Sequence, residues 1–228
     1  MKTPFLKWGF CGAAGALLLL PLAASATLVN NGSFENLNNS YVDNGSGYML
    51  IANGDNSTIP DWTVADLNIA WIKSGGKSGL VGTDGGYFLD LSGIVNTSPF
   101  GGVIGTTIST VAGHTYDLSF DVGRGNGEDG QPVVVLATAG AQSQTFTVNT
   151  TDPGAGKIVW QTFHLQFLAT DSSTTIKING TSADNGNGFI GLDNVSASAV
   201  PEASTVIAGL LLLLPFGAST IRILRKKQ

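Results

Sequence analysis

Apolar and polar residues alternate strictly between His114 and Val122, and no other pattern in the chain restricts its secondary structure so strongly. Successive side chains of a strand point to opposite faces of a sheet, so the alternation predicts a half-buried antiparallel strand. No stretch between the two ends of the chain shows the apolar period of a helix. One predicted face carries Tyr116, Leu118, Phe120 and Val122, and the other carries Thr115, Asp117, Ser119 and Asp121.

Short runs rich in Val, Ile, Phe and Tyr recur along the middle of the chain, separated by Gly, Asn, Ser and Thr. Such spacing is typical of a β-sandwich, in which turns connect antiparallel strands. The fold class predicted for residues 27–199 is therefore all-β, with one antiparallel sandwich as a single domain. Strands are expected at 28–34, 48–52, 62–64, 67–72, 87–91, 103–110, 114–122, 132–139, 142–149, 158–169, 174–179 and 189–199.

The N-terminus has the pattern of a secretory signal peptide. Two lysines precede the apolar run Trp8–Leu22, which is followed by small residues at positions 24–26. This order predicts that residues 1–26 are a signal peptide, which signal peptidase removes after Ala26. An uncleaved anchor helix is the alternative. Cleavage would also remove Cys11, the only cysteine, so the mature domain would fold without disulfides.

The C-terminus has a second apolar run, from Ala203 to Ile221, which holds no charge. At about 1.5 Å per residue, a helix over this run would reach across the roughly 30 Å core of a bilayer. Basic residues stay on the cytoplasmic side, so the predicted helix would leave the domain outside the cell. A plain membrane anchor and a glycolipid-anchor signal are alternatives. The basic residues that follow the run are Arg222, Arg225, Lys226 and Lys227.

Between its two ends the chain is strongly acidic. Residues 27–199 carry five Lys and Arg against fifteen Asp and Glu, a net charge of −10. A domain of this sign repels the phosphates of a nucleic-acid backbone. We therefore expect no nucleic-acid partner.

The C-terminal motif is Val200-Pro201-Glu202, followed by Ala203, the uncharged run and the basic cluster. This arrangement resembles the PEP-CTERM sorting signal of exported proteins of Gram-negative bacteria, in which proline usually stands at the position of Ala203. The resemblance implies recognition by an exosortase-like sorting protease and cleavage near Pro201 and Glu202. It also implies release to, or attachment at, the cell surface, in the company of exopolysaccharide.

Five motifs of the middle occur in one order: 31–35 (NGSFE), 59–62 (IPDW), 87–93 (YFLDLSG), 111–120 (VAGHTYDLSF) and 192–195 (LDNV). Together they resemble galactose-binding-domain-like jelly rolls of the choice-of-anchor C type. They are also similar to a family of plant cell-wall proteins and, more distantly, to carbohydrate-binding modules. The resemblance implies a sandwich of about eight to ten strands, with the first and last strands side by side.

In similar sugar-binding jelly rolls, a calcium ion lies where the first strand meets the last. This carries over to Glu35 and Asp193, with backbone carbonyls near Asn31, and predicts a structural Ca²⁺. Strand parity puts Asp193 on the same face as Phe189 and Val195, so it turns inward if they do. A buried carboxylate is costly unless paired, and hard oxygen ligands suit calcium. The alternative is a bulge that turns Asp193 to solvent or to a turn hydrogen bond.

Groups suited to catalysis are scarce. The middle has no Cys, and its two histidines, His114 and His164, both lie in strand patterns. It contains no Gly-x-Ser-x-Gly elbow and no His-Glu-x-x-His motif. We therefore expect no enzymatic activity. A glycan-acting enzyme with two carboxylates is the remaining alternative, since the sequence does not give the separation of the acids.

Two regions offer candidate ligand-binding residues. The Gly-rich segment 123–130 contains Arg124, Glu128 and Asp129, and a hairpin loop there would place them at one end of the sandwich. Trp160 alternates with polar residues along its strand, so its ring is expected to be exposed for stacking on a sugar.

These features predict an exported, non-enzymatic surface or matrix protein that associates with extracellular polysaccharide or cell-wall glycan. The rival hypothesis is a structural or adhesive module that contacts other proteins and binds no glycan. The precursor is expected to be held in the membrane by its C-terminal helix and then processed.

Overall fold

The computed structural model describes residues 27–76, 79–93, 102–125, 132–149, 153–181 and 189–201. The predicted signal peptide and the predicted C-terminal helix lie outside these ranges, and within them no helix is long and apolar enough to span a membrane. The described elements are the strands β1 (Tyr48–Ile51), β2 (Thr63–Ala65), β3 (Ile69–Lys73), β4 (Tyr87–Asp90), β5 (Val103–Ser109), β6 (Thr115–Gly125), β7 (Val133–Ala139), β8 (Gln142–Val148), β9 (Ile158–Leu168), β10 (Ser173–Gly180) and β11 (Phe189–Ala199).

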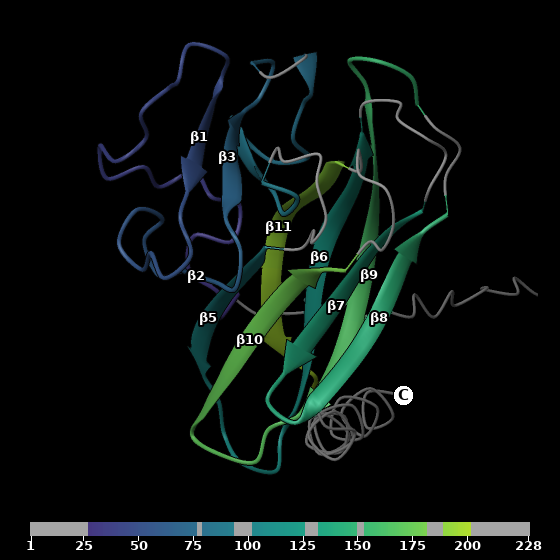
Figure 1. The fold of residues 1–228 in the computed structure, drawn as a ribbon. Coiled ribbons are helices and arrows are strands. Elements are labelled where there is room, and N and C mark those ends of the chain that lie inside the picture. Colours follow the sequence, from purple (N-terminus) through teal and green to yellow (C-terminus); the bar gives the residue numbers. More distant parts are fainter. Residues whose placement is uncertain are drawn as a thin grey trace, which may run out of the picture.

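The strands form two antiparallel sheets that pack face to face (Figure 1). Sheet A has the order β1-β3-β4-β11-β6-β9, and sheet B has the order β2-β5-β10-β7-β8. Every recorded strand pair is antiparallel. The prediction of an all-β antiparallel sandwich is therefore confirmed.

The main core lies between the sheets, and β6 shows how the sequence pattern builds it. Tyr116, Leu118, Phe120 and Val122 are all buried in this core, while the residues between them up to Ser119 are only half-buried. Leu118 and Phe120 of sheet A share the core with Ile176 and Ile178 of sheet B. The face predicted from the alternation is the face that packs.

The segment predicted as a strand at 28–34 is not one. Asn31 and Phe34 have positive φ values of 49° and 59°, so the backbone turns where a strand would continue. The segment nevertheless runs beside β11, because the amide of Leu28 donates to the Ala197 carbonyl (2.8 Å) and the amide of Val195 donates to the Gly32 carbonyl (2.9 Å). The first and last segments of the domain thus lie side by side, as expected.

A second, smaller apolar cluster covers the outer face of sheet A. It includes Leu80, from the loop between β3 and β4, together with Phe88 and Phe189. Ile158 and Trp160 of β9 pack against it. The β3–β4 loop therefore packs on sheet A through Leu80, while most of its other described residues are exposed.

The register of β11 against β6 shifts between Asp193 and Ser196, and Asn194 has a positive φ of 50°. This bulge changes the phase of the strand. Ile190 and Leu192 face the main core before it, and Val195 and Ala197 face the main core after it. The parity argument that grouped Asp193 with Val195 is therefore wrong.

Candidate functional site

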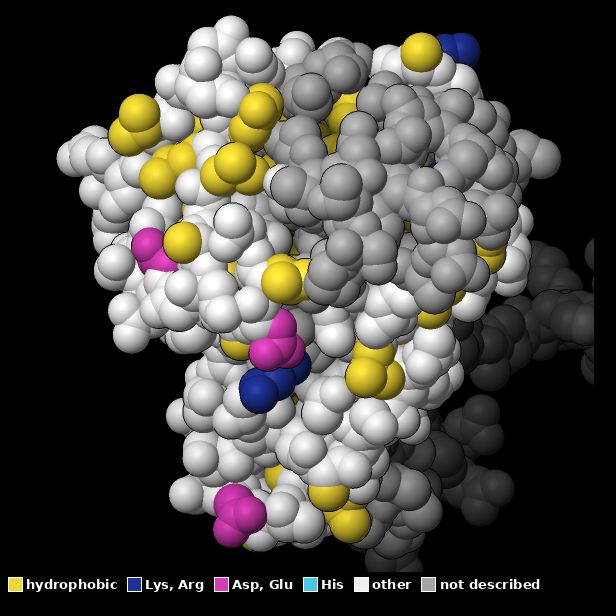
Figure 2. Space-filling model, viewed as in Figure 1, with side chains coloured by type: hydrophobic (Ala, Val, Ile, Leu, Met, Phe, Trp, Pro, Cys, Tyr) yellow, Lys and Arg dark blue, Asp and Glu magenta, His cyan; other side chains and the backbone are white. Residues whose placement is uncertain are grey.

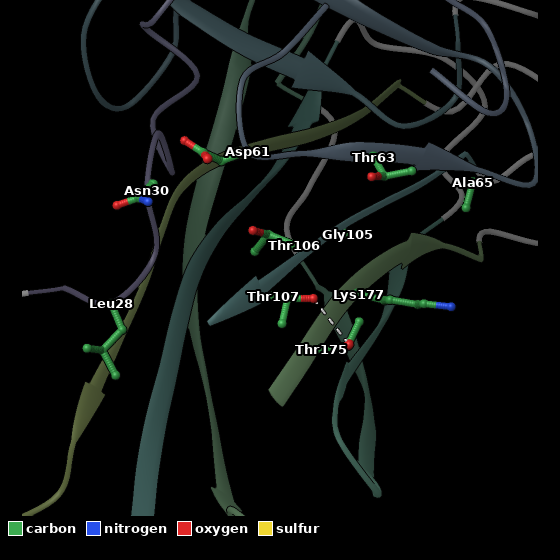
Figure 3. A pocket seen from close by; sticks show the side chains of 10 residues that line it. All are labelled: Leu28, Asn30, Asp61, Thr63, Ala65, Gly105, Thr106, Thr107, Thr175 and Lys177. Atoms are coloured by element: carbon green, nitrogen blue, oxygen red, sulfur yellow. Dashed lines mark hydrogen bonds between the residues drawn. The ribbon is translucent and has the colours of Figure 1, made fainter. Parts of the chain in front are cut away.

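A hollow of about 450 Å³ lies on sheet B, where β5 continues beyond the first residue of β2. We call it the sheet-B hollow. Figure 3 shows residues of the N-terminal segment on one side and residues of β2, β5 and β10 on the others. Its lining consists of Leu28, Asn30, Asp61, Thr63, Ala65, Gly105, Thr106, Thr107, Thr175 and Lys177.

The register of three strands explains the floor of the hollow. Gly105 of β5 stands opposite Thr63 of β2 on one side and opposite Lys177 of β10 on the other. A Cβ on Gly105 would lie 3.3 Å from the Cγ atom of Lys177 and 3.2 Å from the Ile176 carbonyl oxygen. The glycine therefore leaves the space between its two neighbours open.

After Gly105, one side of the main chain of β5 has no paired strand among the described residues. Just outside the two ends of β5, the amide of Thr110 donates to the Ser172 carbonyl (2.9 Å) and the amide of Gly180 donates to the Gly102 carbonyl (3.2 Å). Because hydrogen-bonded positions alternate along a strand, the even-numbered residues of β5 turn their main-chain N–H and C=O groups to β10. The odd-numbered residues face the opposite side, where β2 pairs only with residues 103–105. The N–H and C=O of Thr107 therefore point to a side on which no described strand pairs with them.

The chemistry of the lining is hydroxyl-rich and close to neutral. Threonine is its commonest residue, with one Lys and one Asp as the charged members. The hydroxyls of Thr107 and Thr175 lie 3.3 Å apart across β5 and β10. The face of the molecule in Figure 2 likewise carries few charged side chains. Such a surface offers many neutral hydrogen-bond donors and acceptors and little net charge.

The two carboxylates predicted to bind calcium both hold the β3–β4 loop. Asp193 is fully buried, and its Oδ2 atom accepts hydrogen bonds from the amide of Thr83 (2.7 Å), the hydroxyl of Thr83 (3.1 Å) and the amide of Asp84 (3.0 Å). Its Oδ1 atom accepts from the amide of Asn194 (2.8 Å). Asp193 therefore lies in the bulge of β11 but is turned to the loop and not to solvent.

Glu35 holds the same loop three and four positions after Thr83, the residue that Asp193 contacts. Its Oε1 atom accepts from the amides of Gly86 (2.9 Å) and Tyr87 (2.6 Å). The third predicted group, the Asn31 carbonyl, accepts from the amide of Phe34 (3.1 Å) and from the indole N–H of Trp62 (3.0 Å). Because a carbonyl oxygen has two lone pairs, the Asn31 oxygen is already fully engaged.

The buried charge of Asp193 is compensated by neutral groups. Burial raises the pKa of Asp193 to about 6, against the lowering effect of its hydrogen bonds from Asp84, Asn194 and Thr83. The described residues contain no group of three or more His, Cys, Asp or Glu that could hold a metal. The recorded bonds leave acceptor capacity on Oδ1 of Asp193 and Oε2 of Glu35. Carboxylate oxygens are of the hard type that calcium prefers, together with carbonyls and water.

Trp160 is half-buried on the outer face of sheet A, where two glycines make room for it. A Cβ on Gly191 would lie 2.7 Å from the Cη2 atom of Trp160, and one on Gly123 would lie 2.8 Å from Cε3 and Cζ3. The indole N–H donates to the Val81 carbonyl (2.9 Å), and the ring meets Phe88 edge-on at 5.6 Å. Trp160 thus holds the β3–β4 loop and also borders a groove of about 470 Å³.

Of the other predicted ligand-binding residues, the structure describes only Arg124. Arg124 is buried, with 7% of its surface exposed. Glu128 and Asp129 lie outside the described residues. Of the two histidines, His164 is exposed and its Nδ1 atom lies 2.8 Å from Oδ2 of Asp117.

Sequence reasoning missed the residues of the sheet-B hollow. Thr63, Gly105, Thr107 and Lys177 lie on three strands, and only the register brings them together. The available signal was the alternation of β10, in which Thr175 and Lys177 are exposed between the buried residues Thr174, Ile176 and Ile178.

The model of one protein family, described as "Protein of unknown function (DUF642)", matches residues 27–196. No curated protein matches the chain significantly.

Several solved structures are similar. The carbohydrate-binding module TmCBM61, solved in complex with β-1,4-galactotriose, shares 16% identity with a TM-score of 0.46; the match covers 77% of this chain and 100% of that one. A CBM4 structure shares 18% identity with a TM-score of 0.37 and covers 75% and 99% of the two chains. The CBM22-1 xylan-binding domain of Paenibacillus barcinonensis Xyn10C shares 14% identity with a TM-score of 0.38 and covers 68% and 95%.

Proposed function

Starting from the fact that this chain belongs to the DUF642 family, we propose that it is an exported, non-enzymatic protein that binds extracellular polysaccharide through the sheet-B hollow. The sandwich is proposed to be a galactose-binding-like jelly roll, and its place to be the cell surface or extracellular matrix of a Gram-negative bacterium. The observation that carries the binding proposal is the hydroxyl-rich, nearly neutral lining of this hollow.

The lining suits a sugar for two physical reasons. A sugar presents many hydroxyls, each of which both donates and accepts, and threonine hydroxyls match that character. The volume of about 450 Å³ lies within the usual range of small-ligand sites, so the hollow has room for a short stretch of a polysaccharide chain. The unpaired N–H and C=O of Thr107 add a main-chain donor and acceptor at its edge.

The export part of the proposal rests on the two ends of the sequence. Signal peptidase is proposed to cut after Ala26, and an exosortase-like protease to cut near Pro201 and Glu202. Until the second cut, the uncharged run Ala203–Ile221 is proposed to hold the precursor in the membrane.

A structural calcium ion remains a separate proposal. Glu35 and Asp193 would hold it through their remaining acceptor capacity, with carbonyls and water completing the set. The ion would supply positive charge to the buried carboxylate of Asp193, whose recorded partners are neutral.

A second candidate function is an adhesive module that contacts other proteins. The observation that favours it is the unpaired main chain of β5 at Thr107, because an open strand edge is a template for another extended chain. In that case the hollow would bind a peptide and no glycan.

Affinity electrophoresis of the domain from Thr27 to Ala199, through gels that each contain one polysaccharide, separates the two candidates. Polysaccharide binding predicts retarded migration in at least one gel, relative to an unrelated protein of similar size and charge. Unchanged migration through a broad panel of neutral and acidic polysaccharides would reject the glycan proposal and favour the adhesive one.

A further inference from the structure

We infer that the end of the sandwich at which the chain enters and leaves lies directly on the lipid bilayer in the membrane-held precursor. The inference rests on the C-terminal anchor of the proposed function and adds to it the surface of the domain that meets the lipid. The structural observation behind it is that the first and last residues of the domain, Thr27 and Val200, are both held at this end of the sandwich, beside exposed apolar side chains.

The exit of the chain is fixed by hydrogen bonds to β6. β11 ends at Ala199, and the next amide, of Val200, donates to the carbonyl of Thr115 at the start of β6 (2.9 Å). Thr115 in turn pairs with Leu168 at the end of β9. Among the described residues, the last one with a hydrogen bond to the sandwich is therefore Val200, directly after β11.

The entry of the chain lies at the same end. The hydroxyl of Thr27 accepts a hydrogen bond from the amide of Ala197 (3.2 Å), and the segment then runs antiparallel to β11 as far as Gly32. Thr27 and Val200 therefore both lie beside the end of β11. The two apolar runs of the sequence, before and after the domain, would thus reach one bilayer without crossing the sandwich.

The tether between the sandwich and the proposed membrane helix is very short. Only Pro201 and Glu202 separate Val200 from Ala203, where the uncharged run begins. A fully extended chain spans at most about 3.6 Å per residue, so these three steps reach roughly 11 Å. A helix that starts at the membrane surface therefore holds this end of the sandwich within the depth of the lipid headgroups.

Two turns surround the exit and carry exposed apolar side chains. Val111, in the β5–β6 turn, is 57% exposed, and Leu168, at the start of the β9–β10 turn, is 49% exposed. The turns are joined by hydrogen bonds between Gly113 and Ala169 (2.8 Å) and between Ala169 and His114 (3.0 Å). Val111 and Leu168 therefore belong to one rigid surface around Val200.

The charges of this surface give it no electrostatic attraction to the lipid, so the short link of Pro201 and Glu202 to the proposed membrane helix must hold it there. Asp171 and His114 are exposed in the same two turns, and no Lys or Arg lies in either turn. A carboxylate is repelled by anionic headgroups, so the domain without its C-terminal run is not expected to bind vesicles.

The test uses the chain from Thr27 to Gln228, which has no natural cysteine, reconstituted into phosphatidylcholine vesicles. Single cysteines at Val111→Cys and Leu168→Cys carry an environment-sensitive dye, and Lys157→Cys serves as the control. Lys157 is exposed and precedes β9, whose eleven residues place it roughly 36 Å from Leu168. Lipids that carry a nitroxide on the headgroup quench a dye that lies at the membrane interface. Quenching of the dye should therefore be about twofold or more stronger at positions 111 and 168 than at position 157.

A second variant separates the tether from any other cause of contact. An insertion of about ten Gly and Ser residues after Pro201 adds roughly 18 Å of mean reach, and should reduce quenching at 111 and 168 to the level at 157. Equal quenching at all three sites in the chain without the insertion overturns the inference while leaving the anchor intact. Failure of that chain to stay with the vesicles on flotation overturns the proposed anchor, and the inference falls with it.

Discussion

Asp193 of the last strand accepts a 2.7 Å hydrogen bond on its Oδ2 atom from the amide of Thr83, which lies 110 positions earlier in the chain. Glu35, from the first segment, holds the same loop at Gly86 and Tyr87. Two carboxylates from the two ends of the domain thus fix the β3–β4 loop over the outer face of sheet A. The predictions on stability follow from this arrangement.

Removal of calcium is expected to lower the melting temperature of the domain. An ion that binds only the folded state stabilises it by about 2.7 kcal/mol at a hundredfold excess over Kd. For a domain of this size each kcal/mol corresponds to roughly 2–4 °C, so chelator should lower the midpoint by about 5–11 °C. The measurement is a melting curve with calcium and with chelator, for wild type and for Asp193→Ala.

Asp193→Ala should melt at the same temperature in both buffers, and below wild type in each, because it also loses four hydrogen bonds. If the wild-type curves coincide after bound metal has been shown to be absent, the two carboxylates are hydrogen-bond anchors only.

In chelator, the contribution of Asp193 to stability should fall as pH rises from about 4 to 6. Burial raises the pKa of Asp193 from 3.8 to about 6, so the folded state binds the proton more tightly than the unfolded state does. The contribution is then fully present below the unfolded pKa and is lost as pH rises through the folded pKa, by up to roughly 3 kcal/mol. Denaturant unfolding of wild type and Asp193→Asn at several pH values measures the difference.

The substitution to Asn should remove this part of the pH dependence, because it leaves nothing to titrate at that position. Equal slopes for the two proteins between pH 4 and 6 would contradict the assignment of the raised pKa to Asp193. Added calcium should reverse the trend in wild type, since a cation favours the ionised carboxylate.

Adding a methyl group beneath Trp160 should destabilise the packing of the β3–β4 loop. In Gly191→Ala the new Cβ would lie 2.7 Å from the Cη2 atom of Trp160, and such overpacking costs about 1–3 kcal/mol. Gly86→Ala is the matched control, because its Cβ would meet only Oε2 of Glu35 at 3.6 Å. Urea unfolding should show a lower free energy of unfolding for Gly191→Ala and little change for Gly86→Ala. Equal losses in the two variants would mean that Trp160 does not pack closely on Gly191.

Processing at both ends should be visible in protein from the native host. The placement of charges and apolar runs predicts Thr27 as the first residue and the loss of everything after about Glu202. Mass spectrometry of the intact mature protein measures both ends. Retention of Arg222 to Gln228 in the mature form would contradict the sorting interpretation and favour a permanent anchor.

Much of the fold was accessible from the sequence because alternation is a local signal. The predicted segments 132–139, 142–149 and 158–169 agree with β7, β8 and β9 to within one residue at either end. The segment 28–34 failed because positive φ values at Asn31 and Phe34 break the strand, although the dipeptide Asn31-Gly32 is itself a turn signal.

The candidate sites were harder to predict from the sequence because they depend on which face of a strand each side chain occupies and on the register between strands. The bulge after Asp193 reverses the side on which later residues of β11 point. The sequence left such a bulge open as an alternative, because parity alone does not show where a strand shifts its register. Trp160 was placed on the correct face, but the packing of its ring depends on glycines of two other strands. The sheet-B hollow exists only once Thr63, Gly105 and Lys177 come into register.

The proposed polysaccharide site depends most on the hydroxyls of Thr107 and Thr175. Both residues are exposed strand residues, and the change of Thr to Val keeps the branched shape that a strand favours while it removes the hydroxyl. Loss of two hydrogen bonds of about 1 kcal/mol each should weaken binding by roughly 30-fold. Thr145→Val on β8 is the matched control, because Thr145 is exposed on sheet B but does not line the hollow.

The most direct measurement is therefore calorimetric titration of the domain with the polysaccharide that retards it in gels, for wild type, Thr107→Val with Thr175→Val, and Thr145→Val. The account predicts that the double variant binds roughly 30-fold more weakly with an unchanged melting temperature, while the control binds as wild type does. Wild-type affinity in the double variant would contradict the claim that the sheet-B hollow is the binding site.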